Sequence, residues 1–181
     1  MRIISGKHKG RRIDPGKSFK ARPTTDFAKE NLFNVLNNYF DFNQLTVLDL
    51  FSGTGSISYE FASRGCSPVD SVEVKAKYHA FIRKTATELG LIQLRAIRAN
   101  ALQFLKHTIN RYDIIFADPP YEMNEIEKLP HLIFIRNLLE PGGWFIMEHG
   151  KEHDFSEHPR FREIRRYGSV HFSIFENGTN S

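Results

Sequence analysis

Apolar segments alternate with helix-like segments from Val47 onward, and this alternation constrains the fold more than any other feature of the chain. The segments that are typical of strands are "TVLDLF", "DSVEV", "LRAIRA", "YDIIFA" and "WFIMEH". Between and after these strands we predict helices near residues 55–64, 76–89, 101–109 and 125–139, with "EPGG" ending the last helix. Apolar strands that alternate with helices indicate an α/β fold, in which a mostly parallel central sheet has helices on both faces.

Three further elements flank this core. "RIISG" and "RRI" around the turn-like "KHKG" predict a small N-terminal β-hairpin, and "FREIRRYG" with "SVHFSIFE" predicts a terminal antiparallel hairpin. Between the first hairpin and the core, "RPTTDFAKENLFNVLNNYF" predicts a helix with Thr25 or Asp26 as its N-cap. Its apolar residues at helical spacing are Phe27, Leu32, Phe33, Leu36 and Phe40. We therefore divide the chain into a basic hairpin and loop, residues 1–22, and a main domain, residues 23–181.

Basic residues are concentrated at the N-terminus. Residues 1–22 contain eight Lys or Arg and one acid, Asp14, so this segment carries a charge of +7 within a chain whose net charge is +4. Lys and Arg that neutralise phosphates release counterions, so this segment indicates a polyanionic partner. The alternative is a solvated terminus with no partner.

Other features bear on the compartment. No apolar run approaches the roughly 20 residues that cross a bilayer, and the first residues, "MRIISGKHKG", lack the apolar core of an export signal. The single Cys66 excludes an internal disulfide. A cytoplasmic protein with no membrane partner is therefore expected.

Polar residues and glycines follow the first three predicted core strands. The first strand runs into "VLDLFSGTGSIS", where Gly53 and Gly55 allow a tight turn and the next helix offers its N-terminal amides to an anion. Ser58 stands where a Gly-x-Gly-x-x-Gly pattern requires glycine, which disfavours a dinucleotide. Glu73 after the second strand suits ribose hydroxyls, and Asn100 after the third suits an adenine edge.

Acidic side chains surround this predicted crevice. Asp49, Glu73 and Asp118 each lie at or near the end of a strand, where ligands of parallel sheets bind. Together they favour a ligand with a positive centre over a pyrophosphate. S-adenosylmethionine combines an adenine, a ribose, a carboxylate, an ammonium and a sulfonium, and it is the predicted cofactor.

These motifs resemble a known family. "VLDLFSGTG", Glu73, "RAN" and "DPPY", in this order, resemble the Rossmann-like class I methyltransferases that act on exocyclic amines. Within them "RIISGKHKGRRI", "RPTTD" followed by "KENLFN", and "EHG" look like the RsmD-type family, which methylates N2 of a guanine in 16S ribosomal RNA. The resemblance implies ribosomal RNA or a partly assembled small ribosomal subunit as partner, and a monomeric enzyme.

The same resemblance implies roles for the residues at the cofactor site. Glu73 corresponds to the ribose-binding acid, and Asn100 and Ala101 correspond to the pair that contacts adenine. The methionine end would be held by Asp49 and the turn from Gly53 to Gly55, and the cofactor would also contact Phe51.

The "DPPY" motif indicates how an amine could be oriented for reaction. We expect the Asp118 carboxylate and the Pro119 carbonyl to accept the two N–H groups, because Pro119 and Pro120 hold these acceptors rigidly. Tyr121 would stack on the base. Lys7, Lys9, Arg11, Arg12 and Arg22 are predicted to contact RNA phosphates beside the mouth of the site.

Several alternatives stay open from the sequence. An adenine-N6 methyltransferase would use the same motif, and a nicotinamide-dependent oxidoreductase or a non-catalytic RNA-binding module would share the fold. His149 and His153 could form a metal pair, but no third ligand is evident, so no metal is predicted. Cys66 is expected to pack behind a strand and not to act as a nucleophile.

Overall fold

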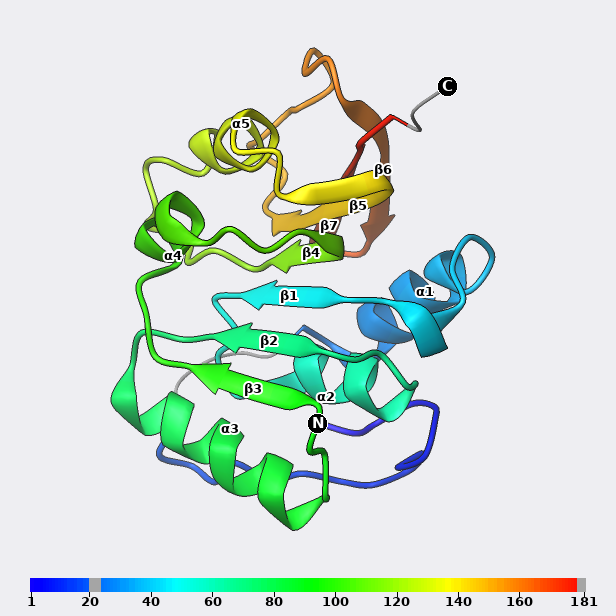
Figure 1. The fold of residues 1–181 in the computed structure, drawn as a ribbon, viewed down its shortest axis with the longest axis vertical. Helices are drawn as coiled ribbons and strands as arrows, with labels where there is room; N and C mark the ends of the chain where they lie inside the picture. Colours follow the sequence, from blue (N-terminus) through cyan, green and yellow to red (C-terminus); the bar gives the residue numbers. More distant parts are fainter. Residues whose placement is uncertain (20–23, 179–181) are drawn as a thin grey trace.

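The computed structural model describes residues 1–19 and 24–178, which form a seven-stranded mixed sheet (Figure 1). The strands are β1 (Val47–Leu50), β2 (Val69–Val72), β3 (Leu94–Ile97), β4 (Tyr112–Ala117), β5 (Leu139–His149), β6 (Phe161–Tyr167) and β7 (Val170–Glu176). Their order across the sheet is β3-β2-β1-β4-β5-β7-β6. β1 to β5 are parallel, and β7 is antiparallel to β5 and β6. The predicted α/β fold with a terminal antiparallel hairpin is confirmed.

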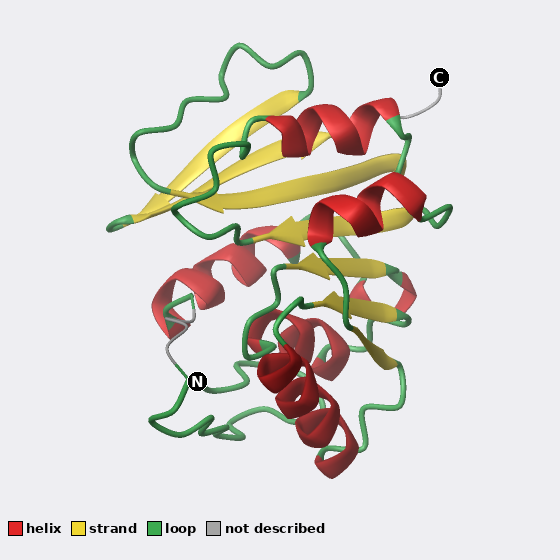
Figure 2. Ribbon diagram, turned by 90° about the vertical axis from the view of Figure 1, so that its left-hand side faces the viewer, coloured by secondary structure: helices red, strands yellow, loops and turns green. Residues whose placement is uncertain are grey.

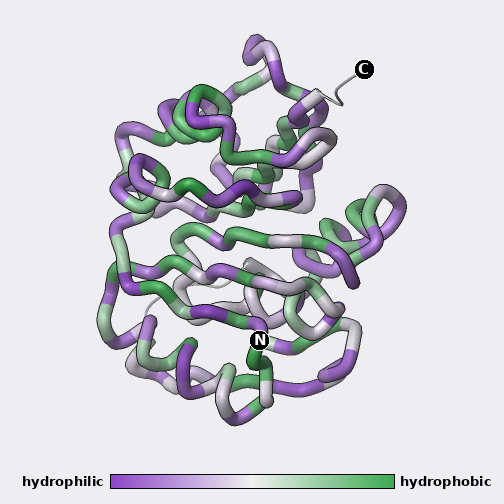
Figure 3. Tube along the Cα trace, in the orientation of Figure 1, coloured by the Kyte–Doolittle hydropathy of each residue, from purple (hydrophilic) through white to green (hydrophobic). Residues whose placement is uncertain are grey.

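Helices cover both faces of the sheet (Figures 1 and 2). α1 (Asp26–Leu36), α2 (Ser56–Ser63) and α3 (Ala76–Glu88) contribute to one core cluster, and α4 (Ala101–His107) and α5 (Lys128–Ile135) contribute to the other. A short 3-10 helix (Phe42–Gln44) precedes β1. β1 is hydrophobic over most of its length (Figure 3). In the described part of the chain, no helix combines the length and apolarity needed to span a bilayer.

Helix α1 begins where the sequence predicted and packs differently from the prediction. The Thr25 hydroxyl accepts a hydrogen bond from the Ala28 amide at 3.2 Å, so Thr25 is the N-cap. Phe27 was expected in the apolar face, but it is 66% exposed. The buried positions include Lys29 instead, because an ion pair inside the protein accepts its ammonium group.

Helix α5 ends earlier than "EPGG" predicted. Asn137 has a φ of 53°, and the amides of Asn137 and Leu138 donate to the carbonyls of Phe134 and Ile133. This Schellman motif ends the helix with a left-handed asparagine. The "EPGG" segment therefore lies inside β5, which begins at Leu139.

The N-terminal hairpin forms with little regular strand structure. Arg2 and Arg12 make an isolated antiparallel bridge, and the Ile3 amide donates to the Arg11 carbonyl at 3.0 Å. Ile3 and Ile13 are buried in the core cluster that includes α1 and α2. The hairpin is thus packed on the main body.

One buried carboxylate fixes the hairpin to α2. Glu60 accepts hydrogen bonds from the amides of Ile4 and Ser5 at 2.8 and 3.0 Å. It also lies 3.7 Å from the Lys29 ammonium and 2.9 Å from the Arg64 guanidinium. Its side chain is fully buried, so these donors replace the water that the carboxylate loses on folding.

Candidate active site

The glycine turn after β1 forms the first wall of the candidate site. Phe51, Gly53 and Gly55 all have positive φ angles, of 57°, 55° and 86°. Gly55 is the N-cap of α2, and a Cβ there would lie 2.7 Å from the Tyr59 ring. The turn can therefore carry the chain from β1 into α2 only with glycine at this position. The Ser58 amide donates to Asp49, whereas the amides of Ser56 and Ile57 have no acceptor within the described residues and could bind an anion.

Glu73 lies beside this turn, at the carboxyl end of β2. Its carboxylate accepts a hydrogen bond from the Gly53 amide at 2.9 Å and from the Lys75 amide at 2.7 Å. Each carboxylate oxygen keeps a further lone pair for another donor. Glu73 thus joins the ends of two neighbouring strands and can still accept hydroxyl groups.

Asp49 lies beneath the turn instead of facing solvent. Its carboxylate accepts a hydrogen bond from the Ser58 hydroxyl, which also lies 2.8 Å from the Ser71 hydroxyl. Burial raises the pKa of Asp49 to about 7, against the opposing effect of the Ser58 hydrogen bond. The structure therefore places Asp49 as an internal support of the turn, within the electrostatic field of the site.

Asn100 and Ala101 lie at the start of α4, after β3. The Asn100 side-chain oxygen caps the helix by accepting from the Gln103 amide at 3.1 Å. Asn100 is exposed, and Ala101 is buried. The cap fixes the Asn100 side chain at the carboxyl edge of the sheet, next to the end of β2.

The "DPPY" segment follows β4 directly. The Pro120 carbonyl accepts the Met123 amide at 2.9 Å, whereas no backbone donor in the described ranges reaches the Pro119 carbonyl. Pro119 is buried, and Tyr121 is 84% exposed. An unused carbonyl and an exposed ring thus flank Asp118 within four residues.

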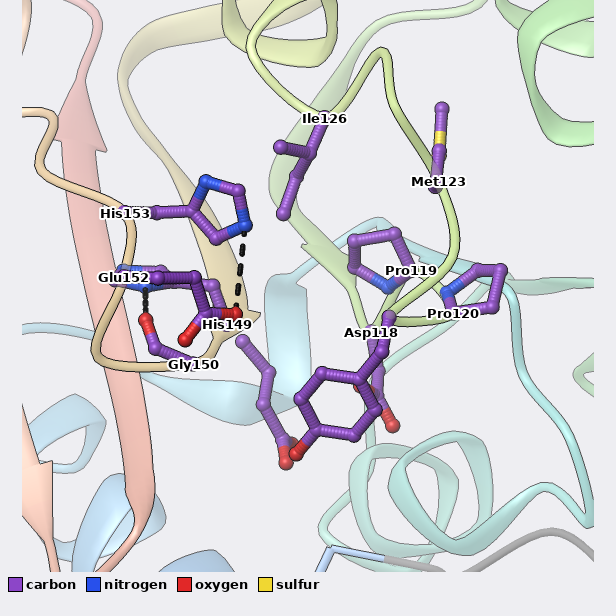
Figure 4. A pocket seen from close by; sticks show the side chains of 11 residues that line it. Asp118, Pro119, Pro120, Met123, Ile126, His149, Gly150, Glu152 and His153 are labelled. Atoms are coloured by element: carbon purple, nitrogen blue, oxygen red, sulfur yellow. Dashed lines mark hydrogen bonds and ion pairs between the residues drawn. The ribbon is translucent and has the colours of Figure 1, made fainter.

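A cleft separates this segment from the chain that follows β5 (Figure 4). Asp118, Pro119 and Pro120 lie on one side, and His149, Gly150 and His153 lie on the other. Glu148 also lines the cleft. Sequence reasoning assigned no role to Glu148, although "EHG" was among the motifs that it used.

The register of β4 and β5 explains why Asp118 and Glu148 meet. Ala117 pairs with Met147, so Asp118 and Glu148 are the next positions on two neighbouring strands, whose spacing is about 5 Å. Burial raises the pKa of Asp118 well above its usual value, and the carboxylates of Glu148 and Asp49 raise it further. Burial also raises the pKa of Glu148, opposed by a hydrogen bond from Thr24.

The His149 ring is buried, and both of its nitrogens have hydrogen-bond partners inside the protein. Its ring nitrogens lie 2.7 Å from the Gly150 carbonyl and 2.7 Å from the Ser173 hydroxyl, and burial lowers its pKa.

Among the described residues, no group of three potential metal ligands occurs. Cys66 is buried behind the sheet, and burial raises its pKa to about 12, which disfavours the thiolate that a nucleophile requires.

The basic residues lie farther from the site than predicted. The Lys7 amide donates to the carbonyl of Ser63, the last residue of α2, at 2.8 Å. The glycine turn is at the other end of this helix, about 12 Å away for eight residues, and the hairpin tip in Figure 1 lies opposite the arrowheads of β1 to β3. Lys7 and Lys9 are therefore not at the mouth. Lys7, Lys9, Arg11 and Arg12 are all exposed, and Arg22 lies outside the described residues.

Comparisons with known proteins agree over nearly the whole chain. A family model described as conserved hypothetical protein 95 matches residues 1–176. Ribosomal RNA small subunit methyltransferase D of Buchnera aphidicola subsp. Baizongia pistaciae is 30% identical, and the match covers 99% of this chain and 93% of that protein.

Solved structures share the same architecture. A hypothetical protein of Thermus thermophilus has a TM-score of 0.85 at 26% identity, and the match covers 97% of this chain and 99% of the other. The 16S rRNA N2 methyltransferase RsmC of T. thermophilus, in complex with AdoMet and guanosine, has a TM-score of 0.67 at 19% identity. That match covers 87% of this chain and 45% of RsmC, and it concerns the fold.

Proposed function

The chain belongs to the RsmD family of small-subunit ribosomal RNA methyltransferases, and on this premise we propose that it methylates the exocyclic N2 amine of one guanine in 16S rRNA. It is an S-adenosylmethionine-dependent rRNA methyltransferase. The observation that carries the choice of an exocyclic amine is a pair of acceptors at the carboxyl end of β4, the Asp118 carboxylate and the Pro119 carbonyl, which no donor reaches within residues 1–19 and 24–178. An oxidoreductase or a non-catalytic module does not account for the family membership.

The residues around the glycine turn fit the cofactor. Glu73 would accept the ribose hydroxyls with its remaining lone pairs, and the free amides at the start of α2 would bind the methionine carboxylate. Asn100 and Ala101 would contact the adenine, and Phe51 would lie against the cofactor. Asp49 would support the turn that holds the methionine end, through its hydrogen bond with Ser58.

Orientation of the amine is the main task of residues 118–121. S-adenosylmethionine supplies a methyl group on a positively charged sulfur. The lone pair of an aromatic amine is delocalised into its ring, so Asp118 and Pro119 would accept both N–H groups and direct the lone pair at the methyl carbon. Pro120 keeps the backbone rigid, and the exposed Tyr121 ring would stack on the base. The proton released from the amine passes to Asp118 or to water.

RNA binding would extend well beyond the target base. Lys7, Lys9, Arg11 and Arg12 are exposed on the hairpin, which contacts the C-terminal end of α2 at Ser63, and would contact phosphates remote from the reacting nucleotide. Arg22 is proposed for the same role from the sequence alone, and so is the division of the chain at residues 22 and 23. We also propose that the enzyme acts as a monomer in the cytoplasm, on ribosomal RNA or on a partly assembled small subunit.

Base mapping tests the proposed reaction. Small-subunit rRNA from cells with and without this protein is digested and compared by mass spectrometry, and one N2-methylguanine should be lost when the protein is absent. Loss of a methyladenine instead would replace the proposal with the adenine-N6 alternative. An unchanged modification pattern would refute both.

A variant tests the residue assignment. Asp118→Ala should bind S-adenosylmethionine within a few-fold of wild type and should lose on the order of 10²-fold or more in turnover. Glu127→Ala is the matched control, since Glu127 is an exposed acid in the same loop region and should behave like wild type. Near-normal turnover of Asp118→Ala would remove Asp118 from the mechanism.

A further inference from the structure

Glu148 occupies a position from which it can reach the same base as Asp118. The pairs Phe116 with Ile146 and Ala117 with Met147 set the register of β4 and β5. Asp118 and Glu148 each lie two residues beyond the first of these pairs, so their side chains leave the sheet on the same face. Both line the cleft between the "DPPY" segment and the chain after β5.

The hydrogen bonds of these two carboxylates are incomplete. The Thr24 hydroxyl donates to Oε2 of Glu148 at 2.6 Å, which orients the carboxylate. Within the described residues, no donor reaches Oε1 of Glu148 or either carboxylate oxygen of Asp118, and the Pro119 carbonyl has no backbone donor. The cleft therefore presents three separate sets of unused acceptors and a stacking ring.

Guanine has the complementary edge. Its Watson–Crick face carries N1–H next to the two hydrogens of the N2 amine, which makes three adjacent donors. Adenine has an amine and an unprotonated N1, so a carboxylate placed against N1 would meet a lone pair instead of a hydrogen. When both carboxyl groups are ionised, the three acceptors in the cleft match guanine and leave adenine with an unpaired acceptor.

We propose that Glu148, held by Thr24, accepts the N1–H of the target guanine and thereby selects guanine over adenine, while Asp118 and Pro119 accept the N2 hydrogens. This inference rests on the proposed function and adds the residue that determines the base. With adenine this hydrogen bond is missing, and the reaction should be much slower, because the buried carboxylate then faces the lone pair of N1 with no hydrogen between them.

The test uses an RNA substrate in which the mapped guanine is replaced by 2-aminopurine. This base keeps the exocyclic amine and presents N1 as an acceptor. Wild-type enzyme should methylate guanine with a kcat/KM at least about 10-fold higher than 2-aminopurine. In Glu148→Gln the amide oxygen can still accept from Thr24, and the amide NH₂ can donate to N1 of 2-aminopurine. The guanine preference should therefore fall by about 10-fold or more.

Two further variants make the result specific. Glu140→Gln changes an acid at the other end of β5 and should leave the preference unchanged. Thr24→Val keeps the Glu148 carboxylate and removes the donor that orients it, so the preference should fall by a smaller factor. S-adenosylmethionine binding verifies that each variant is folded.

The outcomes separate this inference from the proposed function. If wild-type enzyme forms no N2-methylguanine, the proposed function fails. If the wild-type enzyme does form N2-methylguanine and both Glu148→Gln and Thr24→Val keep the wild-type preference for guanine, Glu148 does not contact N1. Only the present inference is then overturned.

Discussion

Asp118, which is proposed to orient the amine, is expected to lower the stability of the folded protein. In the described structure its carboxylate has no hydrogen-bond donor and lies next to Glu148, so the folded protein holds its proton to a higher pH than the unfolded chain does. A carboxyl whose pKa is raised on folding loses stability as the pH rises from the unfolded value toward the folded one. Asp118→Asn removes this loss.

We therefore expect Asp118→Asn to raise the free energy of unfolding at pH 8 by about 1 to 3 kcal/mol relative to wild type. The increase should be smaller at pH 5. The measurement is urea unfolding without cofactor at both pH values. Glu127→Gln is the control, because Glu127 is exposed. A destabilised Asp118→Asn at pH 8 would mean that the carboxylate has a stabilising partner.

At the scale of elements, the N-terminal hairpin is held by buried charges. The Lys29 ammonium donates to the Arg2 carbonyl at 2.6 Å and lies 3.7 Å from Glu60. Burial lowers the pKa of Lys29, and Glu60 opposes this effect. Removing Glu60 alone leaves Lys29 and Arg64 without their carboxylate, whereas removing Lys29 as well leaves only Arg64 uncompensated.

This arrangement predicts a non-additive pair of substitutions. Glu60→Gln should lower the free energy of unfolding by about 3 to 5 kcal/mol. The double variant Lys29→Met, Glu60→Gln should lose less than the sum of the two single changes, by about 1 to 3 kcal/mol. Denaturant unfolding of the four proteins in this cycle measures the coupling, and additive losses would show that the pair is not coupled.

The exposed cations of the same hairpin predict an effect on RNA alone. The hairpin is attached to the main domain by Ile3, Ile13 and the backbone amides of residues 4 and 5. Replacing Lys7, Lys9, Arg11 and Arg12 by Ala should therefore leave the stability of the protein and its affinity for S-adenosylmethionine unchanged. RNA binding should weaken, and its salt dependence should flatten by about 0.7 to 0.9 log units per lost phosphate contact. Fluorescence titrations at several salt concentrations provide the slope.

The control for this variant replaces Arg83 and Lys84, which are exposed on α3, and should keep the wild-type slope. If the fourfold variant keeps the wild-type salt dependence but loses stability, the four basic side chains stabilise the fold and do not bind RNA.

At the scale of the whole molecule, local sequence patterns predicted individual helices and strands better than the contacts between residues that are distant in sequence. Apolar runs were sufficient to place β1 to β4 and the second half of β5, because parallel strands that are covered on both faces are mostly apolar. The end of α5 was predicted wrongly, since glycine and proline in "EPGG" are stronger signals than the left-handed Asn137 that ends the helix. Glu148 was missed because the role proposed for it depends on the register of β5 against β4 and on Thr24, 124 residues away in sequence. The position of Lys7 likewise depends on Ser63 and Glu60, which no local pattern connects to it.

The strand order also determines when the enzyme can be completed during its own synthesis. β7 lies between β5 and β6, although β6 precedes it in the chain. A nascent chain that has emerged from the ribosome only as far as β6 has no partner for that strand, and the edge of β5 is still open. Ser173 on β7, which holds His149 beside the cleft, emerges later still. The sheet that supports the cleft therefore closes only after residue 176 has left the ribosome, so we expect methylation activity only once β7 has been translated.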